Sequence, residues 1–176
     1  MKDTFVEILA VGGKTNSLGR TEEVIQAVLR DNNLLEELYK CVFNDDAWVR
    51  MRAIDAFEKI CREHPDWITQ YIDRFQSELS DSNQPSIQWH LAQMYSQVVL
   101  AKEQKVKSIN WLKNILSSSD IDWIVSANAM KTLVQFAHDG SIDKEDAKAL
   151  IIIQLKHKSK SVVKKANLFL QELKLD

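Results

Sequence analysis

The sequence is poor in turn-forming residues and in cysteine. Only four Gly and two Pro occur in 176 residues. All-β sandwiches and barrels need turn residues between many short strands, so this scarcity argues against them. The two cysteines, Cys41 and Cys61, are twenty residues apart and form no Cys-x-x-Cys pair. This pattern fits free thiols packed as small apolar groups in a reducing compartment, and we expect a cytoplasmic protein.

Long apolar runs and a basic charge excess are also missing. No stretch approaches the roughly 18 apolar residues of a membrane helix, and acids interrupt the N-terminal apolar run, so we expect neither a membrane span nor a signal peptide. The net charge of −2 gives no support to nucleic-acid binding. Residues 1–88 carry a net charge of −6 and residues 89–176 a net charge of +4. This dipole would allow head-to-tail association, although we expect a monomer.

What the sequence does contain is a helical pattern that repeats. One stripe of small and apolar residues follows the spacing i, i+4, i+7, i+11, and it returns at intervals of 38, 38 and 37 residues. The four stripes are Val49, Ala53, Ala56 and Ile60; Ile87, Leu91, Met94 and Val98; Val125, Ala129, Thr132 and Phe136; and Val162, Ala166, Phe169 and Leu173. Each stripe predicts a first helix, here called helix A, of a repeated unit.

A second helix, helix B, is predicted between successive A helices. Its apolar stripes are Ile68, Tyr71, Phe75 and Leu79; Val106, Ile109, Leu112 and Leu116; and Ala147, Leu150, Ile151 and Leu155. Asp46 and Asp122 are placed to cap A helices, and Pro65 and Pro85 suit first turns. One hairpin cannot bury its apolar faces alone, so stacking is required.

These patterns predict one all-α domain over residues 1–176, with about ten helices in antiparallel pairs that form a right-handed α-α superhelix. Residues 1–20 would supply a lead helix and a glycine-containing loop, residues 21–158 the stacked hairpins, and residues 159–176 a C-terminal capping helix. The front pair is expected at 21–30 and 33–44.

The first stripe resembles helix A of a HEAT repeat. Asp46, Val49, Arg50, Ala53 and Ile60 match that pattern, and the later stripes match it in part, with Gln88 and Ser126 at the arginine position. The resemblance covers roughly residues 21–174 and implies a HEAT-like (armadillo-type) solenoid. HEAT-like proteins serve many unrelated purposes, so no activity is implied.

No catalytic, metal or cofactor site is predicted. The run from Gly12 to Thr15 lacks the earlier glycine and the strand of a phosphate-binding loop. Carboxylate pairs at 45–46 and 120–122 are explained by helix capping. The four histidines have no metal-ligand spacing and are interpreted as surface or capping residues. They are His64, His90, His138 and His157.

We therefore predict a non-enzymatic scaffold or adaptor that binds a protein or peptide on the concave face formed by the B helices. Trp111 lies away from the core stripe of its helix and is the predicted anchor, and Ile152 is displaced similarly. The predicted face also carries Asp73, Arg74, Lys107 and Lys148. The alternative is that Trp111 and Ile152 belong to a core wider than one stripe.

A basic patch near the C-terminus supports a different class of partner. It comprises Lys156, Lys158, Lys160, Lys164 and Lys165, with His157 among them and no acid between them. Nucleic acid is therefore the alternative partner, as for HEAT-like alkylation-repair glycosylases, although no acidic catalytic residue beside aromatics matches those enzymes. A solvated cap face is the favoured interpretation of the patch.

Overall fold

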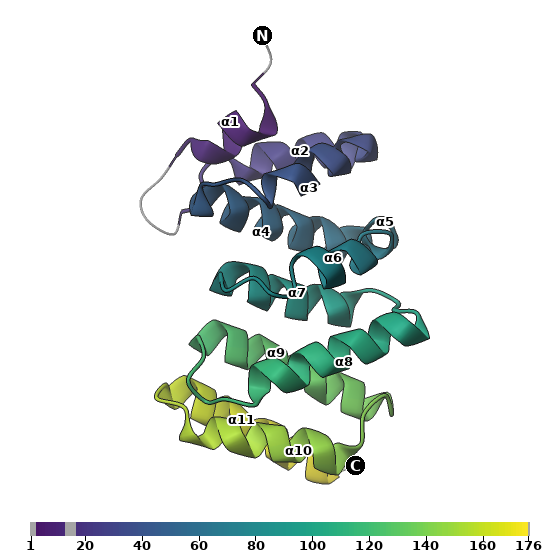
Figure 1. Cartoon of the computed structure of the whole chain (residues 1–176), viewed down its shortest axis with the longest axis vertical. Helices are drawn as coiled ribbons and strands as arrows, with labels where there is room; N and C mark the ends of the chain where they lie inside the picture. The colour runs from purple at the N-terminus through teal and green to yellow at the C-terminus, as the bar shows by residue number, and fades with distance from the viewer. Residues whose placement is uncertain (1–2, 13–16, 176) are drawn as a thin grey trace. The chain divides into compact units, whose positions relative to one another are not determined.

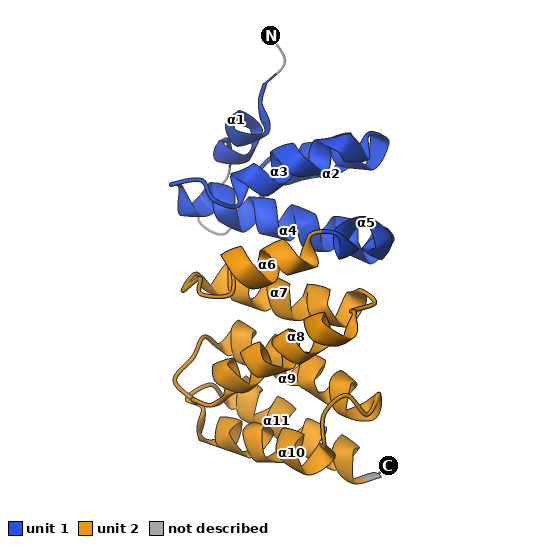
Figure 2. Ribbon diagram, turned by 45° about the vertical axis from the view of Figure 1, so that its right-hand side comes forward, with its two compact units in different colours: residues 1–70 blue, residues 71–176 orange. Residues whose placement is uncertain are grey.

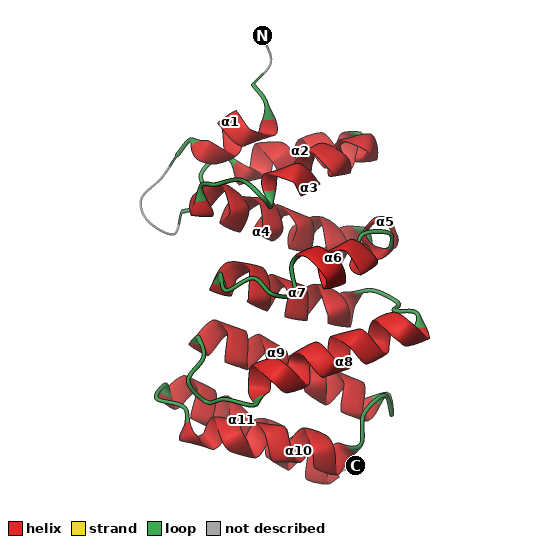
Figure 3. Cartoon of the chain, in the orientation of Figure 1, coloured by secondary structure: helices red, strands yellow, loops and turns green. Residues whose placement is uncertain are grey.

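A computed structural model describes residues 3–12 and 17–175. Helices make up the fold, and these residues contain no strand (Figures 1 and 3). The described residues form eleven α-helices, and their contacts divide the chain into two compact units, residues 1–70 and 71–176 (Figure 2). The single continuous domain expected from the sequence stays a prediction.

Unit 1 is built around one long helix. Its α-helices are α1 (Phe5–Ala10), α2 (Thr21–Arg30), α3 (Leu35–Cys41), α4 (Ala47–Glu63) and α5 (Pro65–Thr69), with a 3-10 turn, η1 (Asn32–Leu34), before α3. The helices α1, α2, α3 and α5 all contact α4. Leu9, Val28, Leu38 and Phe57 are among the side chains that close the core between them.

Unit 2 arranges its helices in two layers. The helices are α6 (Ile72–Glu78), α7 (Pro85–Gln97), α8 (Lys102–Leu116), α9 (Trp123–His138), α10 (Lys144–Ile153) and α11 (Lys160–Leu175), with a 3-10 turn, η2 (Gln154–Lys156), before α11. Successive A helices contact each other in the order α7, α9, α11, and B helices do so in the order α6, α8, α10 (Figure 1). Each layer covers the apolar face of the other, as solenoid stacking requires.

The predicted A stripes are confirmed as the core. All four positions of the stripes in α4, α7 and α9 are buried, and Ala53, Ala129 and Ala166 are fully enclosed. In α11, Phe169 is half-buried, because this last helix has no further A helix beside it within unit 2. The small side chains allow close approach of neighbouring helices, which explains their place in every A stripe except that of α7.

The predicted caps are confirmed as well. Asp46 accepts a hydrogen bond from the backbone N–H of Trp48 at 2.8 Å, and Asp122 accepts one from Ile124 at 2.8 Å. Pro65 and Pro85 open α5 and α7. The carboxylates at these helix starts therefore accept hydrogen bonds from free backbone N–H groups, which is the capping role predicted for them.

Two predicted helices are wrong in extent. Residues 68–79 form two short helices, because the Thr69 hydroxyl and the Gln70 amide bond to carbonyls of the preceding turn and compete with the helical pattern. The helix expected over 33–44 covers only Leu35–Cys41, since Asp31 caps the 3-10 turn that precedes it.

The B stripe of α8 is wrong at one position. Val106 is 51% exposed, whereas Ser108 is fully buried. The Gln76 amide of α6 donates to the Ser108 hydroxyl at 2.9 Å and to the Gln104 carbonyl at 2.8 Å, so Ser108 rather than Val106 is buried near the start of α8. The other predicted positions, Ile109, Leu112 and Leu116, are buried. In the last predicted B stripe, Leu150 of α10 and Leu155 of η2 are half-buried rather than buried.

Candidate functional site

The B helices of unit 2 carry the sequence-predicted binding residues. Trp111 of α8 is half-buried, and its indole N–H donates to the Ser80 carbonyl at 2.9 Å. Its ring packs edge-on against Tyr95 of α7, with centroids 5.7 Å apart. Trp111 therefore joins α8 to the α6–α7 connection, as a residue of a core wider than one stripe would. Its role as the anchor for a partner stays a prediction.

The other predicted residues do not gather around Trp111. Ile152 of α10 is 52% exposed, but α8 meets α10 through a different flank, where Lys113 Nζ lies 3.0 Å from Asp146. Arg74 lies over the ring of Tyr71, and Lys148 pairs with Glu145 at 2.7 Å. These contacts hold each side chain against its own helix.

The remaining two residues of the predicted face, Asp73 and Lys107, are exposed on α6 and α8. Nothing in the described contacts joins either of them to Ile152 across the layer. The B-helix layer therefore presents separate polar positions rather than one apolar centre.

The lysines of the predicted basic patch are all exposed. They divide into two groups. Lys156 and Lys158 lie in and after η2, and Lys158 is 3.5 Å from Asp120. Lys160, Lys164 and Lys165 belong to α11. A cavity of about 310 Å³ beside Lys158 is walled by Trp123, which is 51% exposed.

Two of the histidines are buried, which corrects the interpretation of all four as surface or capping residues. His90 Nδ1 lies 2.6 Å from the Ser86 carbonyl, and Trp89 donates to its Nε2. His157 Nε2 lies 2.9 Å from the Ile121 carbonyl and fixes the loop before α9. His64 and His138 lie at helix C-termini, as expected.

Reactive-group clusters are scarce in the described part of the chain. No three His, Cys, Asp or Glu side chains there are placed to hold a metal ion. Cys41 and Cys61 are buried free thiols, and burial raises their pKa values to about 11 and about 12.

The run that was compared with a phosphate-binding loop cannot be followed in full, because positions 13–15 lie outside the described residues. No described helix is both long and apolar enough to cross a membrane.

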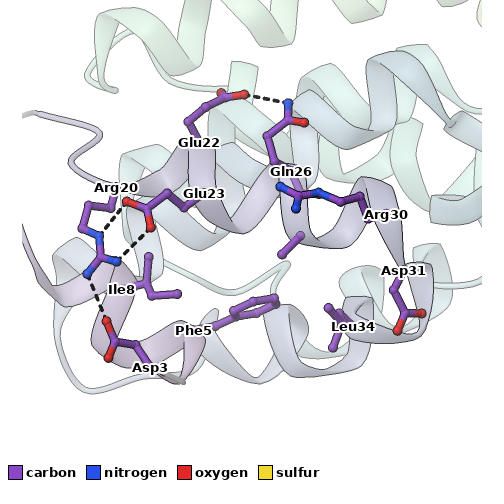
Figure 4. Close-up of a pocket in the computed structure, with 11 residues that line it drawn as sticks. Asp3, Phe5, Ile8, Arg20, Glu22, Glu23, Gln26, Arg30, Asp31 and Leu34 are labelled. Atoms are coloured by element: carbon purple, nitrogen blue, oxygen red, sulfur yellow. Dashed lines mark hydrogen bonds and ion pairs between the residues drawn. The ribbon is translucent and has the colours of Figure 1, made fainter. Parts of the chain in front are cut away.

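A cavity of about 710 Å³ lies in unit 1, between α1, α2 and η1 (Figure 4). We call it the α1–α2 groove. Its apolar floor is formed by Phe5, Ile8, Ala27 and Leu34, of which Phe5 is buried and the others half-buried. The volume lies within the range of about 300–1,000 Å³ found for ligand pockets, and an apolar floor with polar margins is their usual composition.

Charged side chains surround this floor. At one end Arg20 donates to both carboxylate oxygens of Glu23, at 2.6 and 2.8 Å, and to Asp3 at 3.2 Å (Figure 4). The hydrogen bond from Arg20 lowers the pKa of Glu23. At the other end lie Arg30 and Asp31. With Glu22 included, four acids and two arginines line the groove, so its margin is acidic.

Local sequence signals explain why the groove has this form. Thr4 and Glu7 make a reciprocal capping box that starts α1 and sets the direction of Phe5 and Ile8. The Phe5 backbone N–H donates to Glu37 of α3 at 3.0 Å, which ties α1 to unit 1.

Arg52 of α4 secures the other end of α1. It is buried and donates to the carbonyls of Leu9, Gly12 and Ser17 at 2.5, 2.6 and 3.0 Å. Gly19 has a φ of +53°, and a Cβ there would lie 2.6 Å from the Val11 carbonyl. A glycine is therefore required where this loop turns past Arg52.

The sequence contained partial signals for this site. The capping box and the amphipathic pattern of 21–30 identify α1 and α2, but residues 1–20 gave only a lead helix and a loop. The groove itself depends on the tertiary contact between residues 3–8 and 20–34.

Comparison with known families now assigns the class of protein. The sequence profile of a HEAT repeat domain matches residues 13–166. The chain belongs to this HEAT repeat family, and its all-α structure of stacked helical pairs agrees with that membership. Neither the curated proteins nor the solved structures contain a match to the chain.

Proposed function

We propose that this HEAT repeat protein is a non-catalytic scaffold or adaptor, and that it binds a segment of a partner protein in the α1–α2 groove. The observation that carries the proposal is the combination of an open apolar floor with charged margins in one cavity of about 710 Å³. Interfaces place apolar anchors in such a centre and polar contacts around it.

The groove supports this role better than the B-helix layer does. Trp111 already donates its N–H and packs its ring within unit 2, so its removal would disturb the fold. In the groove, by contrast, Ile8, Ala27 and Leu34 remain partly accessible, and no element within residues 3–12 and 17–175 covers them. A partner with apolar side chains and a basic flank would match both the floor and the acidic margin.

Affinity capture from cells of the native organism tests the proposal when three forms of the bait are compared. Ala27→Lys places a long cationic side chain across the floor, and Ala149→Lys puts the same change on an exposed position of α10. We expect a partner that is retained by the unchanged protein and by Ala149→Lys but is lost by Ala27→Lys. Partners retained equally by all three would contradict the groove as the binding site.

A further inference from the structure

The outer face of α11 is a second surface that no element of the described residues covers. The inward face of this helix buries Val162, Ala166 and Leu173. On the opposite face, Lys160, Lys164, Leu168 and Gln171 are all exposed and follow one another at helical spacing. Leu168 is 54% exposed, which makes it an apolar side chain one turn after two lysines. We call these four residues the α11 stripe.

The two uncovered surfaces are complementary in chemistry. The α1–α2 groove offers an apolar floor with four acids and two arginines around it, whereas the α11 stripe offers one leucine with lysines beside it. Among the described residues, Lys160 and Lys164 make no ion pair, so both are available to carboxylates of another molecule. The chain as a whole has the same asymmetry, with −6 on residues 1–88 and +4 on residues 89–176.

We propose that the groove of one molecule receives the α11 stripe of a second copy. Leu168 would enter the floor near Ala27 and Leu34, and Lys164 would meet the acidic margin at Glu22 or Asp31. Because the two surfaces differ, the contact is heterologous, and an open assembly has one free groove at one end and one free α11 stripe at the other. This inference rests on the proposed function in using the same groove, and it names the occupant.

The exposed leucine favours a protein over a nucleic acid as the partner of this stripe. The phosphates of a nucleic acid would pair with the lysines but leave Leu168 in water, whereas a protein groove would cover this side chain. One leucine and a few screened ion pairs stabilise a contact only weakly, so the association is expected at high protein concentration and low salt.

Light scattering and sedimentation equilibrium of the full chain test the proposal. The mass-average molar mass should rise above that of one protomer as the protein concentration increases at low salt. It should fall again at high salt, because the ion pairs are screened. A mass of one protomer at every concentration in low salt overturns the proposal.

Matched variants locate the contact. Ala27→Lys and Leu168→Glu should each weaken association about tenfold or more, as removal of a central contact does. The controls are Ala149→Lys and Ile152→Glu on α10, where Ile152 is 52% exposed and therefore comparable with Leu168. Loss of association in the controls as well overturns the assignment. If Ala27→Lys does not fold, Glu22→Lys tests the margin from an exposed position.

An equimolar mixture of Ala27→Lys and Leu168→Glu gives a sharper result. One variant keeps its α11 stripe and the other keeps its groove, so the mixture should form dimers and nothing larger. A mixture that stays monomeric while the unchanged protein associates overturns the heterologous contact. The proposed function fails separately, if no foreign protein is captured in a groove-dependent way.

Discussion

Arg52 is a charged side chain in the interior of unit 1, and no carboxylate is among its described hydrogen-bond partners. Three backbone carbonyls of the segment between α1 and α2 accept its hydrogen bonds. The planar guanidinium donates from three separate nitrogen atoms, Nε, Nη1 and Nη2, whereas lysine would have to reach all three carbonyls from one nitrogen. The position of α1, and with it the floor of the groove, therefore depends on this side chain.

Arg52→Lys should lower the free energy of unfolding by about 2–4 kcal/mol, because hydrogen bonds to a buried charged group each contribute about 1.5–3 kcal/mol and at least one is lost. Urea unfolding followed by circular dichroism measures this change. Arg30→Lys, at an exposed position of α2, is the control and should change stability by less than about 0.5 kcal/mol. Equal stability of Arg52→Lys and the unchanged protein would contradict the role of Arg52.

The two thiols are expected to be inert while the protein is folded. Burial raises the pKa of Cys41 to about 11 and that of Cys61 to about 12, so little of either thiolate is present at pH 7. A thiol reagent such as dithionitrobenzoate should label neither residue in native buffer and both in denaturant. Rapid labelling of either thiol in the folded protein would show that the core opens there.

At the scale of helices, the A stripes form the core on which the whole account depends. Ala53 is fully enclosed in α4, and an aspartate there would place an unpaired charge in the interior. Ala53→Asp should cost about 3–5 kcal/mol or prevent folding, since a buried uncompensated charge has that effect. Thermal unfolding of Ala53→Asp and of Ala149→Asp, at an exposed helical position, makes the comparison. An unchanged melting temperature for Ala53→Asp would contradict the stripe.

The helices show how far the sequence could predict the structure. Helical spacing found the A helices because four apolar or small positions per helix agree on one face, and the aspartates fixed two of their starts. Val106 was misplaced because the decisive contact of α8 is polar, between Gln76 and Ser108. Gln154 was missed for the same reason. It is fully buried, and its amide donates to the carbonyls of Leu116 and Ser118 at 2.9 Å.

The candidate site was less predictable than the fold. Trp111 was chosen by its angle on an ideal helix, but an angle does not show that the Ser80 carbonyl lies within hydrogen-bond distance. The α1–α2 groove depends on how residues 3–8 lie against residues 20–34, which no local pattern reports. The exposure of Leu168 could have been predicted, because it falls opposite Val162 and Ala166 on α11.

For the molecule as a whole, the charge distribution sets expectations for nucleic acid. The net charge is −2, and the exposed lysines that cluster in sequence without an acid between them lie in η2, its following loop and α11. Binding to duplex DNA should therefore be weak and should disappear at physiological salt. A fluorescence-anisotropy titration over a salt series measures it. Tight binding with a steep negative slope of log K against log salt would instead favour the nucleic-acid alternative.

Amide hydrogen exchange tests most directly whether the α1–α2 groove is the working surface. Exchange would be compared between dilute and concentrated protein at low salt, with Ala27→Lys as the control. We predict that concentration slows exchange in α1, α2, η1 and α11 of the unchanged protein, and that Ala27→Lys shows no such slowing. Protection confined to α8 and α10 around Trp111, or no protection at any concentration, would contradict the account.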